Sequence, residues 1–173
     1  MCWGDTGLLL SMPRQGLGNS AIASVANEEQ LKRYEGTWAA MAITEPGTGS
    51  DSANLKPAAV LDGDEYVLNG EKIFVTSGQR ADSVVVWATL DKSLGRAAIK
   101  SFLVRRENPG MKVERLEHKL GIRASDTAVI TTSAAWPSRA ALASTTAKVS
   151  PGPCAWAATC SAAQASTTAT ALV

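Results

Sequence analysis

The residues with the clearest potential for chemistry lie in the loop Thr44–Asp51, which follows an apolar lead-in that begins at Met41. Pro46, Gly47 and Gly49 interrupt any regular structure in this loop. Two glycines this close together let the backbone approach a bulky group and direct several N–H groups at one point, which is one way to hold a phosphate. The spacing is not the dinucleotide-binding fingerprint, because no third glycine opens a helix. The residues alone indicate a candidate anion site, and the alternative is a strand followed by a surface turn.

Other residues that could do chemistry show no functional pattern. His118 is the only histidine in the sequence, so we expect a packed or surface residue rather than a metal ligand or a triad member. Cys2, Cys154 and Cys160 are widely scattered without metal-ligand spacing, and we predict no metal site. An odd number of cysteines without a pattern suits a reducing compartment, so we expect a cytoplasmic protein.

Composition and charge argue against several classes of partner. The chain of 173 residues has a net charge of +1 and no block of basic residues, so nothing predicts binding to nucleic acid or to a membrane surface. No stretch approaches the roughly 18 apolar residues that a membrane span needs. The N-terminus lacks a charged lead followed by a long apolar run, and we expect no signal peptide. The length suffices for one core, or for one core with an appendage.

Residues 1–36 are expected to form helix pieces separated by loops. The run Gly7–Leu10 is too short for an independent element, Gly16–Gly18 interrupts the chain, and Ser20–Ala26 could be a helix with small residues on a packed face. The best-defined helix follows, because Asn27 is a good N-cap and Gln30 lies three residues later, as in a capping box. We expect this helix to end near Gly36.

From about Thr37 the sequence changes to short apolar runs separated by turn residues. The predicted strands are Trp38–Thr44, Ala58–Leu61, Tyr66–Leu68, Lys72–Thr76, Ser83–Thr89, Lys100–Arg105, Lys112–Arg115 and Ala128–Thr132. Asp62-Gly63 and Asn69-Gly70 lie between adjacent runs, where hairpin turns need residues that tolerate positive φ. No helical period separates the strands, which favours antiparallel pairing. We therefore predict an α+β chain with a short N-terminal helical segment at 1–36 and an antiparallel barrel-like or sandwich-like β-domain at 37–132.

The remaining residues, 133–173, have a different composition. Residues 131–173 contain no Asp or Glu, and Ala, Ser and Thr make up most of them. This bias predicts a low-complexity tail that is disordered or irregular. A shifted reading frame is the other interpretation of so abrupt a change.

Three segments resemble signatures of the acyl-CoA dehydrogenase family. They are Ile43–Asp51 (Ile-Thr-Glu-Pro-Gly-Thr-Gly-Ser-Asp), Asn69–Gly78 (Asn-Gly-Glu-Lys-Ile-Phe-Val-Thr-Ser-Gly) and Lys119–Thr127 (Lys-Leu-Gly-Ile-Arg-Ala-Ser-Asp-Thr). The resemblance implies a fragment that contains the end of an N-terminal helical domain and a flavin-binding middle β-domain. The sequence departs from the family pattern at three positions, Thr48, Asn54 and Phe74, the last of which replaces the commoner Trp.

The resemblance also implies a cofactor, FAD, and a set of residues that bind it. These are Met41, Ala42, Ile43, Thr44, Glu45, Pro46, Gly47, Thr48, Gly49 and Ser50 from the first segment, and Phe74, Val75 and Thr76 from the second. In the family the aromatic-aliphatic-Thr triplet packs on the isoalloxazine ring and bonds near its N5 atom. Ser50 falls where the family contacts the acyl-CoA ligand, so we expect it to bind substrate.

The implied enzyme is an oxidoreductase of fatty-acid metabolism. It performs α,β-dehydrogenation of an acyl-CoA thioester with hydride transfer to FAD, uses electron-transfer flavoprotein as electron acceptor, and is a homo-oligomer at full length. The family's carboxylate base comes from a C-terminal helical domain without a counterpart in this sequence, so we assign no catalytic residue and expect weak FAD binding without turnover. The alternatives are a flavin-dependent monooxygenase or nitroalkane oxidase on the same scaffold, or an inactive β-domain.

Overall fold

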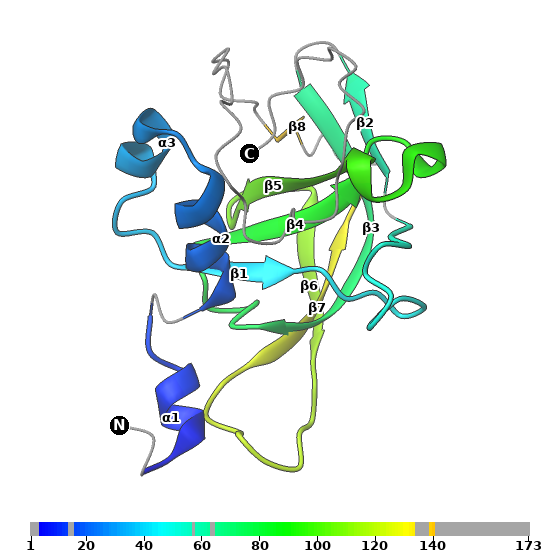
Figure 1. Ribbon diagram of the computed structural model, residues 1–173. Helices are drawn as coiled ribbons and strands as arrows, with labels where there is room; N and C mark the ends of the chain where they lie inside the picture. The colour runs from blue at the N-terminus through cyan, green and yellow to red at the C-terminus, as the bar shows by residue number, and fades with distance from the viewer. Residues whose placement is uncertain (1–3, 14–15, 57, 63–64, 134–138, 141–173) are drawn as a thin grey trace.

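A computed structural model describes residues 4–13, 16–56, 58–62, 65–133 and 139–140. Helices occupy the N-terminal part of these ranges, and strands of one curled sheet follow (Figure 1). This order confirms the predicted α+β class. Within the described ranges, no helix is long and apolar enough to cross a membrane.

The N-terminal helices are short. They are α1 (Thr6–Leu10), α2 (Leu17–Val25) and α3 (Glu28–Arg33). The expectation that the run Gly7–Leu10 is too short for an independent element was wrong, because this run lies in a helix whose first turn is capped by the Asp5 side chain. The capping box predicted at the start of α3 is present, because Asn27 and Gln30 each accept from the other's backbone N–H. Helix α2 begins earlier than expected and includes Gly18, where a Cβ atom would lie 2.4 Å from the carbonyl oxygens of Ala39 and Ala40. Gly18 therefore permits close helix–strand contact and does not interrupt the helix.

The strands form one sheet in the order β1-β4-β2-β3-β7-β6, with β5 on β4 and β8 on β3. A short 3-10 helix, η1, precedes β5. Their bounds are β1 Ala39–Ala42, β2 Ala58–Asp62, β3 Glu65–Thr76, β4 Ser83–Thr89, η1 Lys92–Ala98, β5 Ile99–Arg105, β6 Met111–Leu116, β7 Thr127–Thr132 and β8 Arg139–Ala140.

Antiparallel pairing, as predicted, joins β2 to β3, β3 to β7 and β8, β4 to β5, and β6 to β7. The exceptions among the described strands are β1 and β2, which pair with β4 in parallel, β1 from Ala39 opposite Ser83 to Ala42 opposite Val86. Parallel neighbours need a long connection, and here β2 and β3 supply it. Alternation of apolar residues does not reveal whether a neighbouring strand runs parallel or antiparallel. The sequence therefore suggested antiparallel pairing alone, whereas the sheet is mixed.

The prediction of a hairpin tip at Asn69-Gly70 was wrong. Residues 66–68 and 72–76 belong to one strand, β3, which passes through both residues without turning back. Asn69 pairs with Ala58 of β2, whereas Gly70, at φ 157, pairs with Thr132 of β7. Gly70 therefore supplies the bend at which β3 leaves one neighbour and joins the other, which is a common use of glycine inside a strand.

The main core lies inside the curled sheet. Its fully buried members come mostly from β1, β3, β4, β5 and β7, and they include Val75, Val84, Phe102 and Ile130. A smaller cluster under α2 joins Ile22 to Ala39 and Val85. The predicted tail lies outside the described residues, except for Ser133 and β8, and the domain boundaries at 36/37 and 132/133 stay predictions.

Candidate functional site

A cavity of about 220 Å³ lies where the N-terminal helices meet the ends of β1 and β3. Asn19 of α2 holds the helix against the strand, because its side chain donates to the Thr37 carbonyl oxygen (2.7 Å) and accepts from Ala39 N–H (3.0 Å). The cavity is lined by Leu10, Gly16, Leu17, Trp38, Ala39, Ala40, Met41, Ile43, Thr44, Ile73, Phe74, Thr76 and Ser77. The structure thus brings the first two signature segments to one site.

A β-bulge turns Phe74 out of the core. In a regular strand Phe74 would share a face with Lys72, which is buried. The register of β3 against β7 shifts between Lys72 and Val75, and Phe74 adopts φ 56, a left-handed conformation that is rare for a bulky residue. As a result Val75 is 1% exposed in the core and Phe74 is 59% exposed beside the cavity. The bulge presents an aromatic face to whatever occupies this site.

A buried ion pair joins the first two signature segments to each other. The Lys72 Nζ atom lies 2.8 Å from Oε1 of Glu45, and both side chains are almost fully buried. The same Nζ donates to the Ile43 carbonyl oxygen (3.1 Å), and Ile73 N–H donates to the Thr44 carbonyl oxygen (2.8 Å). Burial lowers the pKa of Lys72 from its ordinary value, while the hydrogen bond to Glu45 and its charge act in the opposite direction.

The glycine loop folds on itself. The N–H groups of Glu45 and Thr48 each donate to the other's carbonyl oxygen, at 3.0 and 3.1 Å, which closes a tight turn. Thr48 is buried beneath this turn, and its hydroxyl donates to the Asn54 carbonyl oxygen. Lys56 N–H donates to Glu45 Oε2 at 2.9 Å. Two of its N–H groups are therefore used within the turn, and the anion site suggested by this loop stays a prediction.

The predicted cofactor residues therefore occupy different environments. Five of the thirteen line the cavity: Met41, Ile43, Thr44, Phe74 and Thr76. Two have side chains in the core, Ala42 and Val75. The others lie in or after the turn: Glu45 and Thr48 are buried, Pro46 and Gly47 border an open groove beside Lys56 and Gly70, and Gly49 and Ser50 are exposed.

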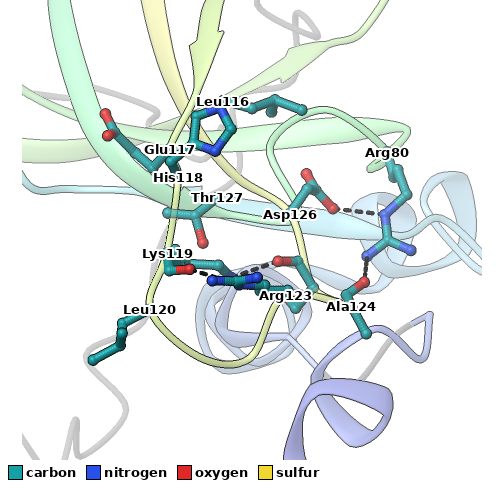
Figure 2. Close-up of a pocket in the computed structure, with 11 residues that line it drawn as sticks. Arg80, Leu116, Glu117, His118, Lys119, Leu120, Arg123, Ala124, Asp126 and Thr127 are labelled. Carbon is teal, nitrogen blue, oxygen red and sulfur yellow. Dashed lines mark hydrogen bonds and ion pairs between the residues drawn. The ribbon is translucent and has the colours of Figure 1, made fainter.

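The third signature segment forms the loop between β6 and β7 and lines a wider cleft of about 890 Å³ (Figure 2). Its Asp126 accepts from Arg80 Nε at 2.6 Å, and Arg80 also donates to the Ala124 carbonyl oxygen at 3.4 Å. His118 borders the cleft and is exposed, as expected for a surface residue. Helix α1 lies beside this loop (Figure 1), since a methyl group on Gly7 would come within 3.3 Å of the Ala124 Cβ atom.

A family model described as "Acyl-CoA dehydrogenase, middle domain" matches residues 40–135, more than half of the chain. The chain belongs to the acyl-CoA dehydrogenase family. The resemblance of the three signature segments is thereby confirmed. The matched region contains every strand from the second residue of β1 to the end of β7, together with the whole set of predicted cofactor residues.

Individual acyl-CoA dehydrogenases agree with this assignment. The chain is 40% identical over 130 residues to a short-chain specific acyl-CoA dehydrogenase of Clostridium acetobutylicum, which covers 72% of this chain and 34% of that protein. A crystal structure of a probable acyl-CoA dehydrogenase from Mycobacterium abscessus matches with a TM-score of 0.70 at 34% identity, over 75% of this chain and 36% of the other. A Bacillus anthracis acyl-CoA dehydrogenase complexed with FAD matches with a TM-score of 0.62 at 36% identity, over 68% and 21%. The chain spans about a third of the length of the curated relative.

Sequence reasoning missed several residues that build the site. Leu10, Leu17, Trp38 and Ser77 line the cavity although they lie outside the quoted cofactor positions. For Lys72 a signal was present, because it shares a strand face with the buried Leu68 and is therefore an inward-facing lysine that needs a buried partner.

Proposed function

We propose that this acyl-CoA dehydrogenase family chain forms one wall of an FAD site, in an enzyme that removes two hydrogens across the α,β bond of an acyl-CoA thioester. The observation that carries the proposal is the cavity at which two segments thirty residues apart in sequence meet, with Phe74 turned outward between them. In this enzyme class, bound FAD supplies a ring that accepts hydride from the substrate Cβ atom.

The residues present fit one side of a flavin. Phe74 and Ile43 give the cavity an apolar wall, and the Thr44 and Thr76 hydroxyls make no hydrogen bond to any other described residue, so both can serve a ligand. The cavity volume of about 220 Å³ is smaller than the roughly 300–1,000 Å³ of common small-molecule sites. A whole FAD therefore exceeds this cavity, and the fit is to one part of the cofactor.

The chemistry assigned to this chain is binding and orientation. Thr44 and Thr76 would donate hydrogen bonds to the polar edge of the ring, and Ser50, which is exposed beyond the turn, would contact the acyl-CoA. No carboxylate is among the residues that line the cavity in the described part of the chain. Glu45 is a poor general base because it is buried and its carboxylate is held by Lys72 and by Lys56 N–H. We assign no catalytic base to this chain.

The finer assignments follow the same proposal. Acyl-CoA is the substrate, electron-transfer flavoprotein accepts the electrons, and the full-length enzyme is a homo-oligomer that acts in fatty-acid metabolism in the cytoplasm. The support for the substrate class is the family membership together with the similarity to acyl-CoA dehydrogenases. The support for a reducing compartment is the scattered set of three cysteines.

Titration of FAD with the 173-residue chain, followed by flavin fluorescence, tests the proposal. We expect a saturable change with a dissociation constant on the order of micromolar or weaker, because the cavity contacts only part of the cofactor. A fluorescence signal that stays linear up to about millimolar chain would contradict a flavin site on this domain.

A further inference from the structure

The third signature segment does not line the cavity, yet one of its residues contacts a turn that does. This turn, Ser77–Arg80, follows β3 directly, and Ser77 lines the cavity. Ser77 N–H donates to the carbonyl oxygen of Asp126 at 3.0 Å. The Asp126 carboxylate accepts from Gln79 N–H at 2.8 Å through Oδ2 and from Arg80 Nε at 2.6 Å through Oδ1.

The turn has a conformation that needs support from outside. Ser77 adopts φ 62, in the left-handed region that residues other than glycine and asparagine seldom occupy. Such a residue persists when surrounding contacts over-determine it. Within this region Gly78 N–H donates to the Val75 carbonyl oxygen. From other parts of the chain, Asp126 adds three bonds and the Arg106 side chain donates to the Gly78 carbonyl oxygen.

A second path leads from Asp126 to the cavity through Arg80. The Arg80 guanidinium lies 5.5 Å from the centre of the Trp38 ring, and Trp38 lines the cavity. Figure 2 shows the guanidinium between the Asp126 carboxylate and the Ala124 carbonyl oxygen, and it donates to both. The Asp126 side chain is 10% exposed and that of Arg80 is 41% exposed, so solvent screens this charged hydrogen bond in part.

We propose that Asp126 is a positioning residue for the flavin cavity: it fixes Ser77 through the turn and Trp38 through Arg80. The inference rests on the proposed flavin site and assigns the third signature segment a role in it. Asp126 itself is not among the residues that line the cavity. Replacing its side chain keeps the main-chain bond to Ser77 and removes the bonds from Gln79 N–H and Arg80. Binding is therefore weakened because the turn and the Arg80–Trp38 contact are loosened, without loss of a direct contact to the flavin.

The test compares FAD binding by the 173-residue chain and its variants Asp126→Ala and Asp126→Asn, using flavin fluorescence. We expect at least a tenfold weaker dissociation constant for Asp126→Ala. Asp126→Asn keeps the side-chain volume and one acceptor oxygen, so it is expected to bind FAD with intermediate affinity; it also carries the test if the alanine variant does not fold. Val104→Ala is the matched control, because Val104 is a core residue of β5 that does not line the cavity.

The control separates positioning from general stability. Val104→Ala is expected to lower the unfolding temperature while FAD affinity stays within twofold of the parent chain. Equal FAD affinity in the parent chain and in folded Asp126→Ala or Asp126→Asn would overturn the inference, as would an equal loss of affinity in Val104→Ala.

Amide hydrogen exchange on the chain without FAD gives an independent readout. Exchange of the Gln79 N–H is expected to accelerate at least tenfold in Asp126→Ala and not in Val104→Ala, since only the former removes its acceptor. Unchanged exchange at Gln79 would overturn the positioning role by itself. A parent chain that binds no FAD would instead contradict the proposed function, and the exchange measurement would still decide whether Asp126 holds the turn.

Discussion

Lys72 of β3 and Glu45 of the loop after β1 form an ion pair of 2.8 Å inside the protein, with side-chain exposures of 2% and 3%. Both segments of the proposed flavin wall are thereby attached to one another at a point that solvent does not reach. Lys72 extends the attachment to the Ile43 carbonyl oxygen, so the charge of one lysine serves both a carboxylate and a backbone acceptor. Removal of one of these partners would leave the other charge buried and unpaired, which lowers the stability of the folded state.

We predict that Lys72→Met destabilises the chain by about 3–5 kcal/mol, because removal of one partner leaves the Glu45 carboxylate buried without its ion pair. Urea unfolding measures the loss. The matched control is Lys112→Met, which breaks the exposed pair with Glu114 and should cost far less, because solvent screens exposed ion pairs. The double variant Lys72→Met with Glu45→Leu should recover much of the loss. Equal destabilisation by Lys72→Met and Lys112→Met would contradict this account of the pair.

The bulge at Phe74 predicts that substitutions of this residue change the stability of the chain and its affinity for FAD in different ways. Because Phe74 is 59% exposed and has φ 56, Phe74→Gly loses little buried area and relieves a left-handed conformation that costs roughly 1–2 kcal/mol for other residues. Phe74→Gly should therefore be more stable than Phe74→Ala by about 1 kcal/mol. Both variants should bind FAD less tightly than the parent chain, as flavin fluorescence would show. An alanine variant more stable than the glycine variant would argue against the bulge.

Close contact between α2 and β1 predicts that alanine is worse than glycine at position 18, although alanine is the better helix former. A methyl group at Gly18 would lie 2.4 Å from two backbone oxygens, and we expect Gly18→Ala to cost about 1–3 kcal/mol despite the gain of roughly 1 kcal/mol in helix propensity. Gly121→Ala is the control, since nothing lies within 4 Å of its Cβ position. Thermal unfolding distinguishes the two, and a stabilised Gly18→Ala would contradict the helix–strand contact.

Hydroxyl groups at the cavity predict a selective loss of flavin affinity. Thr76→Val removes a hydrogen-bond donor at nearly constant volume, and the dissociation constant for FAD should rise by about fivefold to tenfold, the equivalent of one hydrogen bond of roughly 1 kcal/mol. His118→Gln, at the cleft lined by the loop that connects β6 and β7, should leave the dissociation constant unchanged. Equal losses from both substitutions would mean that the cavity is not the flavin site.

Sequence patterns correctly predicted those elements whose formation depends on residues close together in the chain. The capping box of Asn27 and Gln30 and the bounds of β4, Ser83–Thr89, agree with the structure because each depends on neighbouring residues alone. The hairpin expected at Asn69-Gly70 failed because those residues serve a bend where β3 changes partners. Turn propensity cannot distinguish the two uses of glycine, since both need the same backbone freedom.

The sequence predicted which segments form the candidate site, but it did not predict which of their side chains face the cavity. Ile43, Thr44, Phe74 and Thr76 do meet at one cavity, as the signature segments suggested. That Phe74 faces outward while Val75 enters the core depends on a register shift against β7, which no periodicity in β3 reveals. The roles of Glu45 and Thr48 likewise depend on contacts with Lys72 and Asn54 that only the folded chain creates.

A crystal structure of the chain grown with FAD tests the central claim most directly. The account predicts that the flavin ring lies against Phe74, with polar ring atoms within hydrogen-bond distance of the Thr44 and Thr76 hydroxyls and with Trp38 and Ser77 at its border. A flavin bound in the cleft lined by the loop that connects β6 and β7, or against the turn Glu45–Thr48 with the cavity at Phe74 filled by solvent, would contradict it.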